Sequence, residues 1–180
     1  MSEITSPAKS AIQYGLFFGV IMVLEFVIPY ALGLDLIKNQ TLGLTINILN
    51  FLVLPILFIS LALNNFKKNI NKGFLSFGQG LKAGVSVTVI AGLISAVFMI
   101  IFFLIFPEYG QEILEKTREV MVEKNPNMTQ EQLDMSMSMM EKFSSPYITG
   151  PVTVAMYALI GLIYSLIISA ILKNDQPQGY

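Results

Sequence analysis

Few residues of this chain have side chains that could do chemistry, and the most informative of them is Glu25. It lies in Ala11–Leu34, an otherwise apolar stretch that is long enough to cross a bilayer. A carboxylate near the middle of a membrane costs about 2.5–3.5 kcal/mol even on the insertion scale, so an intramembrane acid is by default a hypothesis for a functional site. Asn47 and Asn50 lie in the next apolar stretch, with Asn50 at nearly the same depth as Glu25. We therefore expect a hydrogen bond between Glu25 and Asn50, and a candidate ligand or ion site formed by Glu25, Asn47 and Asn50.

Two prolines bear on this candidate site. Pro29 lacks the N–H that would donate to the carbonyl of Glu25, and Pro55 has the same effect on the carbonyl of Phe51. Kinked helices with freed carbonyls beside a carboxyl group form cation sites in some transporters. The alternative is that a protonated Glu25 acts as structural glue, since interhelical polar pairs contribute about 0.6 kcal/mol on average. The sequence leaves both interpretations open.

The amino-acid composition indicates that these residues lie in a lipid bilayer. Of the 180 residues, 54% are hydrophobic and 13% are charged, whereas soluble domains have about 25% charged residues. Four apolar segments of at least 22 residues account for this: Ala11–Leu34, Leu42–Leu63, Val85–Phe106 and Pro151–Leu172. We predict an all-α polytopic membrane protein with four transmembrane helices and one integral membrane domain over residues 1–180. The first segment is too long for the apolar region of a signal peptide, so we expect it to be retained.

Several classes of chemistry are disfavoured. The chain has no Cys and no His, which removes disulfides, the common zinc sites, thiol nucleophiles and imidazole catalysis. No nucleophile–base pair or phosphate-binding loop stands out, and the net charge of −1 gives no basic surface for nucleic acid. We expect neither an enzyme, a cofactor, a metal site nor a nucleic-acid partner.

The distribution of charge predicts the topology. The loop between the second and third spans contains four lysines and no acid: Lys67, Lys68, Lys72 and Lys82. Short loops rich in lysine remain cytoplasmic, so both termini should be cytoplasmic. The segment Pro107–Gly150, which carries eight acids and four bases, should then lie on the outer side. Within the inner loop, Gly73–Gly84 has helical apolar spacing and predicts a short interfacial helix that bends into the third span.

The outer segment, residues 107–145, should form a helical hairpin between the third and fourth spans. Gln111–Lys124 is amphipathic, Pro126 stops it, and Thr129 with Gln132 forms a capping-box pattern that starts Gln130–Phe143. In the second helix Leu133, Met137, Met140 and Phe143 should face one way. The hairpin is a candidate surface, Gln111–Phe143, for a protein partner.

Six of the ten methionines lie in this segment: Met121, Met128, Met135, Met137, Met139 and Met140. Thioethers can select Cu(I), so a copper site is one interpretation. Their spacing favours the other interpretation, because Met137 and Met140 fall on the apolar side and methionine is an adaptable packing residue.

Small residues at four-residue spacing predict close helix packing. They form Gly15-x-x-x-Gly19, Gly80-x-x-x-Gly84 and the series Gly161, Ser165 and Ser169. Such motifs serve equally within one bundle and between the chains of a homo-oligomer, and the sequence does not distinguish the two.

These motifs resemble the four-helix membrane proteins of Bacteroidetes collected as domain-of-unknown-function family 4199. The resemblance rests on Tyr14-Gly15 opening the first span, the run Gly73–Gly84, Pro107 closing the third span, the acidic helices with their Pro-x-Met-Thr turn, and Gly161 with Ser165. It covers about residues 8–173 and implies a location in the bacterial inner membrane, with no assigned activity.

Two classes of function remain. In the first, the protein is a structural or interaction module of the inner membrane whose outer hairpin engages a partner. In the second, it is a small transporter or channel subunit in which Glu25 is a proton or cation site.

Overall fold

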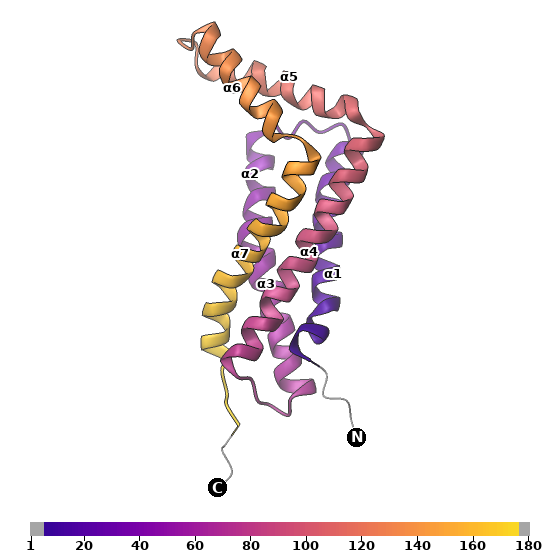
Figure 1. Ribbon diagram of the computed structural model, residues 1–180, viewed down its shortest axis with the longest axis vertical. Coiled ribbons are helices and arrows are strands. Elements are labelled where there is room, and N and C mark those ends of the chain that lie inside the picture. Colours follow the sequence, from indigo (N-terminus) through magenta and orange to yellow (C-terminus); the bar gives the residue numbers. More distant parts are fainter. Residues whose placement is uncertain (1–5, 177–180) are drawn as a thin grey trace.

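The computed structural model describes residues 6–176, which are all-α and contain no strand. Four helical segments are long and apolar enough to cross a membrane: α1 (Pro7–Ala31), the second span Gln40–Ile70, α4 (Phe77–Ile105) and α7 (Pro146–Leu172). They run side by side as a bundle, and α5 (Pro107–Lys124) and α6 (Gln130–Phe143) extend across one end of it (Figure 1). The predicted all-α architecture with four membrane-spanning helices is confirmed.

The second span is not a single regular helix. It consists of α2 (Gln40–Ile48), a π-helical turn η1 (Leu49–Val53), α3 (Leu54–Asn65) and a second π-helical turn η2 (Phe66–Ile70). Every residue of α2 keeps some exposure, whereas α3 buries Phe58, Ile59, Ala62 and Leu63 in the core. The second span therefore packs against the other helices mainly through α3.

Small residues on α4 let α7 approach closely. Four facing pairs recur at four-residue spacing along the antiparallel helices: Gly80 with Ser169, Gly84 with Ser165, Thr88 with Gly161, and Gly92 with Tyr157. A Cβ atom added to Gly92 would lie 3.0 Å from the Cβ of Tyr157, and one added to Gly84 would overlap the Ser165 hydroxyl group. The small-residue series of α7 thus packs within the chain.

The packing of α1 on α4 uses the other glycine motif. A Cβ atom on Gly15 would lie 2.7 Å from the Cβ of Ile90 and 2.8 Å from the carbonyl oxygen of Val87. Gly19 faces Ile94 in the same way, at 2.8 Å. Both glycine motifs named from the sequence therefore bring helices together inside the bundle, with α4 between α1 and α7.

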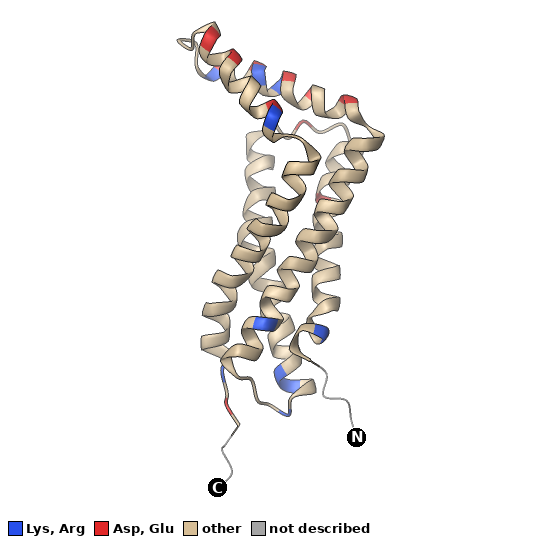
Figure 2. Ribbon diagram, in the orientation of Figure 1, with Lys and Arg blue, Asp and Glu red and all other residues tan. Residues whose placement is uncertain are grey.

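Charged residues separate to the two ends of the bundle (Figure 2). The end where α1 and α4 begin, which we call the lysine-rich end, carries lysines with few acids, whereas α5 and α6 at the acid-rich end carry most of the acids together with several bases. The lysine-rich end is closed by long-range hydrogen bonds. Lys67 Nζ donates to the carbonyl of Leu172 at 2.9 Å, and the backbone groups of Leu75 and Asn174 pair at 2.8 and 2.9 Å.

The expected interfacial helix over Gly73–Gly84 is wrong. The chain turns at Gly73, where φ is +89°, and α4 then begins at Phe77 and continues without a break into the third span. Ser76 and Gln79 form a reciprocal capping box that satisfies free N–H groups at this start. Because Gly80 and Gly84 face α7, this part of the helix belongs to the packed bundle.

Candidate functional site

Glu25 and Asn50 form a direct contact inside the bundle. Asn50 Nδ2 donates to Glu25 Oε2 at 2.6 Å, and it also lies 3.2 Å from the carbonyl oxygen of Ile46. Both side chains are half-buried, and Asn50 lies in the π-helical turn η1. The hydrogen bond expected from their depth is present. Turns of this kind inside α-helices are frequent at functional sites.

The oxygen of the Asn50 side-chain amide has no hydrogen-bond partner among the described residues. Asn50 Oδ1 is buried and accepts no hydrogen bond from any of residues 6–176. A buried acceptor of this kind is costly unless something pairs with it, and a proton donor, water or a cation could all do so. The Glu25–Asn50 pair therefore combines a carboxyl group with an unpaired oxygen.

Asn47 does not join this pair. Its side chain is exposed, although it precedes Asn50 by only three residues. The π-helical turn begins between them, and its wider spacing changes the direction in which the following residues point. The fold therefore does not bring Glu25, Asn47 and Asn50 together into one site.

Tyr164 is a member of this region that the sequence did not single out. Its hydroxyl group donates to the carbonyl oxygen of Phe51 at 2.9 Å. This is the carbonyl that Pro55 deprives of its helical donor, so α7 supplies from another span the hydrogen bond that the second span lacks. A tyrosine within an apolar span needs a partner for its hydroxyl group, which is the signal that could have identified it.

Aromatic rings pack beside the pair. Tyr157 is 2% exposed, and its ring centroid lies 6.0 Å from that of Phe51 and 5.9 Å from that of Phe18. Phe18 in turn stacks on Phe58 at 5.5 Å. This cluster joins α1, η1, α3 and α7, and Phe51 follows Asn50 directly in the chain.

A second polar arrangement holds α5 over the loop between α1 and α2. Lys116 Nζ lies 3.2 Å from Asp35 and 2.6 Å from Glu112, and Lys38 Nζ lies 2.8 Å from Glu119. We call these five residues the acid-end clamp. The pKa of the Asp35 carboxyl is lowered, first by the hydrogen bond from the backbone N–H of Lys38 and also by Lys116. The pKa of Lys116 is raised by its hydrogen bonds to Glu112 and Asp35.

The two sides of α6 differ in exposure. Leu133 is buried and Met137 and Met140 are half-buried, as expected for the packed side. Phe143 was expected with them, but it is 63% exposed because α6 ends there and the chain turns toward α7. Met135 and Met139, at four-residue spacing before it, are 68% and 52% exposed. Met135, Met139 and Phe143 form what we call the exposed stripe.

Metal ligands are not gathered anywhere in the described part of the chain. Residues 6–176 contain no group of three or more His, Cys, Asp and Glu side chains able to hold a metal ion. The methionines of α6 are divided between its packed side and the exposed stripe, so they do not converge on one point.

Comparison with known proteins gives one match. The model of a protein family described as "Protein of unknown function (DUF4199)" matches residues 13–174, which include most of α1 and all of the later helices. No curated protein and no solved structure matches the chain.

Proposed function

The chain belongs to the DUF4199 family, and we propose that it is a structural or interaction module of the bacterial inner membrane. Its outer segment, Gln111–Phe143, docks a protein partner. The lysine-rich end with both termini faces the cytoplasm, because lysine-rich ends remain inside, and the acid-rich end faces outward. The resemblance to Bacteroidetes proteins supports a bacterial source.

The observation that carries this proposal is the exposed stripe. Met135, Met139 and Phe143 are each more than half exposed, although α6 has a second apolar side that packs inward. Ion pairs keep the two outer helices in position: Arg118 of α5 pairs with Asp134 of α6 at 3.1 Å, and Lys38 holds α5 through Glu119. A fixed apolar surface containing methionine and an aromatic ring has the character of a protein contact.

Photo-crosslinking tests this proposal. A benzoylphenylalanine at Met139 should give a discrete protein adduct in cells, and the same group at the exposed Glu131 of the same helix should not. Adding Met135→Ser and Phe143→Ser should remove the adduct. An adduct of twice the chain mass would identify the partner as a second copy, and thus a homo-oligomer. Crosslinking to lipid alone would refute the proposal.

We also propose that the protein has no catalytic activity, cofactor or nucleic-acid partner of its own. The absence of Cys and His from the chain and its net charge of −1 support this.

The role of the outer segment is tested by deletion. A deletion of Gln111–Phe143 bridged by a Gly/Ser linker should leave the four spans inserted, and cells that carry it should have the same phenotype as cells that lack the protein. Full function of the deletion variant would refute the role of the outer segment.

A second candidate function is a small transporter or channel subunit. It is favoured by the buried Asn50 Oδ1, which has no partner among the described residues and lies beside the Glu25 carboxyl group. Asn50 Oδ1 and a carboxyl oxygen of Glu25 could together hold a proton or cation. Reconstituted vesicles that carry a pH-sensitive dye would report proton flux, and vesicles that carry a Na⁺- or K⁺-sensitive dye would report cation flux. Flux that Glu25→Gln abolishes would establish this function, and equal flux in both proteins would exclude Glu25 as its site.

A further inference from the structure

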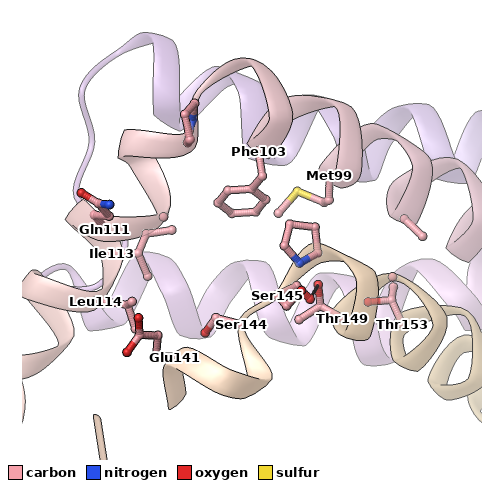
Figure 3. A pocket seen from close by; sticks show the side chains of 15 residues that line it. Met99, Phe103, Gln111, Ile113, Leu114, Glu141, Ser144, Ser145, Thr149 and Thr153 are labelled. Atoms are coloured by element: carbon pink, nitrogen blue, oxygen red, sulfur yellow. Dashed lines mark hydrogen bonds between the residues drawn. The ribbon is translucent and has the colours of Figure 1, made fainter. Parts of the chain in front are cut away.

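A cavity lies where the third and fourth spans leave the bundle. It has a volume of about 480 Å³, within the range of about 300–1,000 Å³ typical of small-molecule pockets. Met99 and Phe103 of α4 face Thr149 and Thr153 of α7 across it, and α5 and α6 complete its walls (Figure 3). Because the third span ends and the fourth begins here, we place the cavity at the level where lipid headgroups meet the hydrocarbon.

Small residues keep this cavity open. Gly110 and Ser145 line it near the two corners where α4 continues into α5 and α6 into α7, and Ala96 and Gly150 line it from within α4 and α7. A Cβ atom on Gly110 would lie 3.6 Å from the Phe103 ring, an ordinary contact, so the helix itself would accept a larger residue there. The longer side chain of a leucine at position 110 would extend into the cavity and fill part of it.

A second, polar cavity, open at the surface and lined by exposed charged residues, adjoins the first. It lies between α5 and α6, has a volume of about 430 Å³ and shares Gln111, Leu114 and Glu141 with the apolar cavity. Its other charged residues are Glu115, Asp134 and Arg118. Arg118 pairs with Asp134, whereas Glu115 and Glu141 form no ion pair within residues 6–176. The polar cavity therefore has a surplus of negative charge and one guanidinium group.

We propose that the two cavities together bind one bilayer phospholipid with an ethanolamine headgroup. One acyl chain enters the apolar cavity between α4 and α7. The ammonium group lies against Glu115 and Glu141, and the phosphate lies against Arg118, whose guanidinium group has five N–H donors.

The charges select this headgroup among the common ones. A phosphatidylglycerol headgroup has no cation to meet Glu115 and Glu141, and its negative charge would oppose theirs. Phosphatidylcholine has the same net charge as phosphatidylethanolamine, but its quaternary ammonium has no N–H to donate to a carboxylate. The preference should therefore be ethanolamine, then choline, then glycerol.

Native mass spectrometry of the purified full chain in maltoside detergent tests the proposal. The protein is incubated with equal amounts of the three phospholipids, all with the same acyl chains. Phosphatidylethanolamine should occupy the protein about three- to tenfold more than phosphatidylglycerol, as expected for two partly exposed ion pairs. The double variant Glu115→Gln/Glu141→Gln should lose this preference. The matched variant Glu123→Gln/Glu131→Gln, on the same helices but outside both cavities, should keep it.

Gly110→Leu tests the apolar cavity separately. It should remove bound phospholipid of every kind, whereas Gly78→Leu, where a Cβ atom would meet nothing within 4 Å, should bind as the wild type does. Dodecylamine is the probe for a simple cationic amphiphile without phosphate. Equal binding of the three phospholipids, a preference unchanged in Glu115→Gln/Glu141→Gln, or dodecylamine competing as well as phosphatidylethanolamine would overturn the proposal.

Discussion

At the scale of single residues, Glu25 shows how a carboxyl group is accommodated in an apolar helix. Its partner Asn50 lies on the neighbouring span at 2.6 Å, and Tyr164 supplies a donor to the carbonyl freed by Pro55. Each polar group is thus met from a different helix, as is required where water is absent. Asn50 Oδ1 is the exception, and it is what makes the pair a candidate for more than structural glue.

If Glu25 is structural glue, its replacement should have small effects on stability. Glu25→Gln should preserve the bundle because Gln keeps a hydrogen-bond acceptor for Asn50 Nδ2. Glu25→Leu should lower the free energy of unfolding by about 1 kcal/mol, because interhelical polar pairs are weak. Thermal unfolding in detergent measures both. Curves for wild type and Glu25→Gln should respond equally to added Na⁺ or K⁺, whereas a stabilisation seen only in the wild type would favour the ion site.

At the scale of elements, the bundle depends on how closely α1 and α7 approach α4. Gly15→Ala should destabilise the protein by about 1–3 kcal/mol, because its Cβ atom would lie 2.8 Å from the backbone oxygen of Val87, which cannot move aside. Gly78→Ala is the matched control on α4, where a Cβ atom meets nothing within 4 Å. It should be neutral or stabilising, by up to about 1 kcal/mol, through helix propensity. Equal unfolding temperatures for both variants would contradict this packing.

The acid-end clamp should depend on pH. A carboxyl group with a lowered pKa stabilises the folded state above its unfolded pKa of about 3.9, and that contribution disappears as the pH falls through the lower folded value. For Lys116, whose pKa is raised, the contribution is complete below about pH 10.4 and disappears as the pH rises through the higher folded value. The clamp should therefore hold between these limits and loosen outside them.

Spin labels at the exposed positions Leu34 and Val122 would report this loosening as a wider distance distribution. The distribution should widen in the wild type as the pH falls through the lowered pKa of the Asp35 carboxyl. Asp35→Asn keeps the acceptor for the N–H groups of Ile37 and Lys38 but removes the charge that meets Lys116. It should give a wider distribution already at pH 7, and Asp175→Asn, at the other end of the chain, should not. Equal distributions for the wild type and Asp35→Asn at pH 7 would count against the clamp.

At the scale of the whole molecule, charge separation between the two ends predicts the orientation in the membrane. The chain has no native Cys, so single cysteines can be introduced at Asn69 in the lysine-rich end and at Asn127 between α5 and α6. An impermeant maleimide added to intact cells should label position 127 and not position 69. Disrupted cells, in which both positions should react, are the control, and the reverse pattern in intact cells would invert the topology.

The sequence by itself determined what depends on local composition and periodicity. The four apolar segments, the turn at Pro126 and the capping box of Thr129 and Gln132 could all be read from it. Each follows from residues close together in the chain: apolar length, a missing N–H or a side chain that reaches a nearby backbone group. The separation of lysines from acids is of the same kind.

Only the tertiary structure decided which of the predicted contacts form. Asn50 rather than Asn47 reaches Glu25, because a π-helical turn changes the direction of one helix relative to another. Gly80 and Gly84 serve the bundle, and the segment before the third span is a regular helix instead of an interfacial one. The exposed stripe and the two adjoining cavities likewise depend on how α5 and α6 pack at the end of the bundle. Helix rotation and register are set by packing between distant segments, and periodicity within one segment does not specify them.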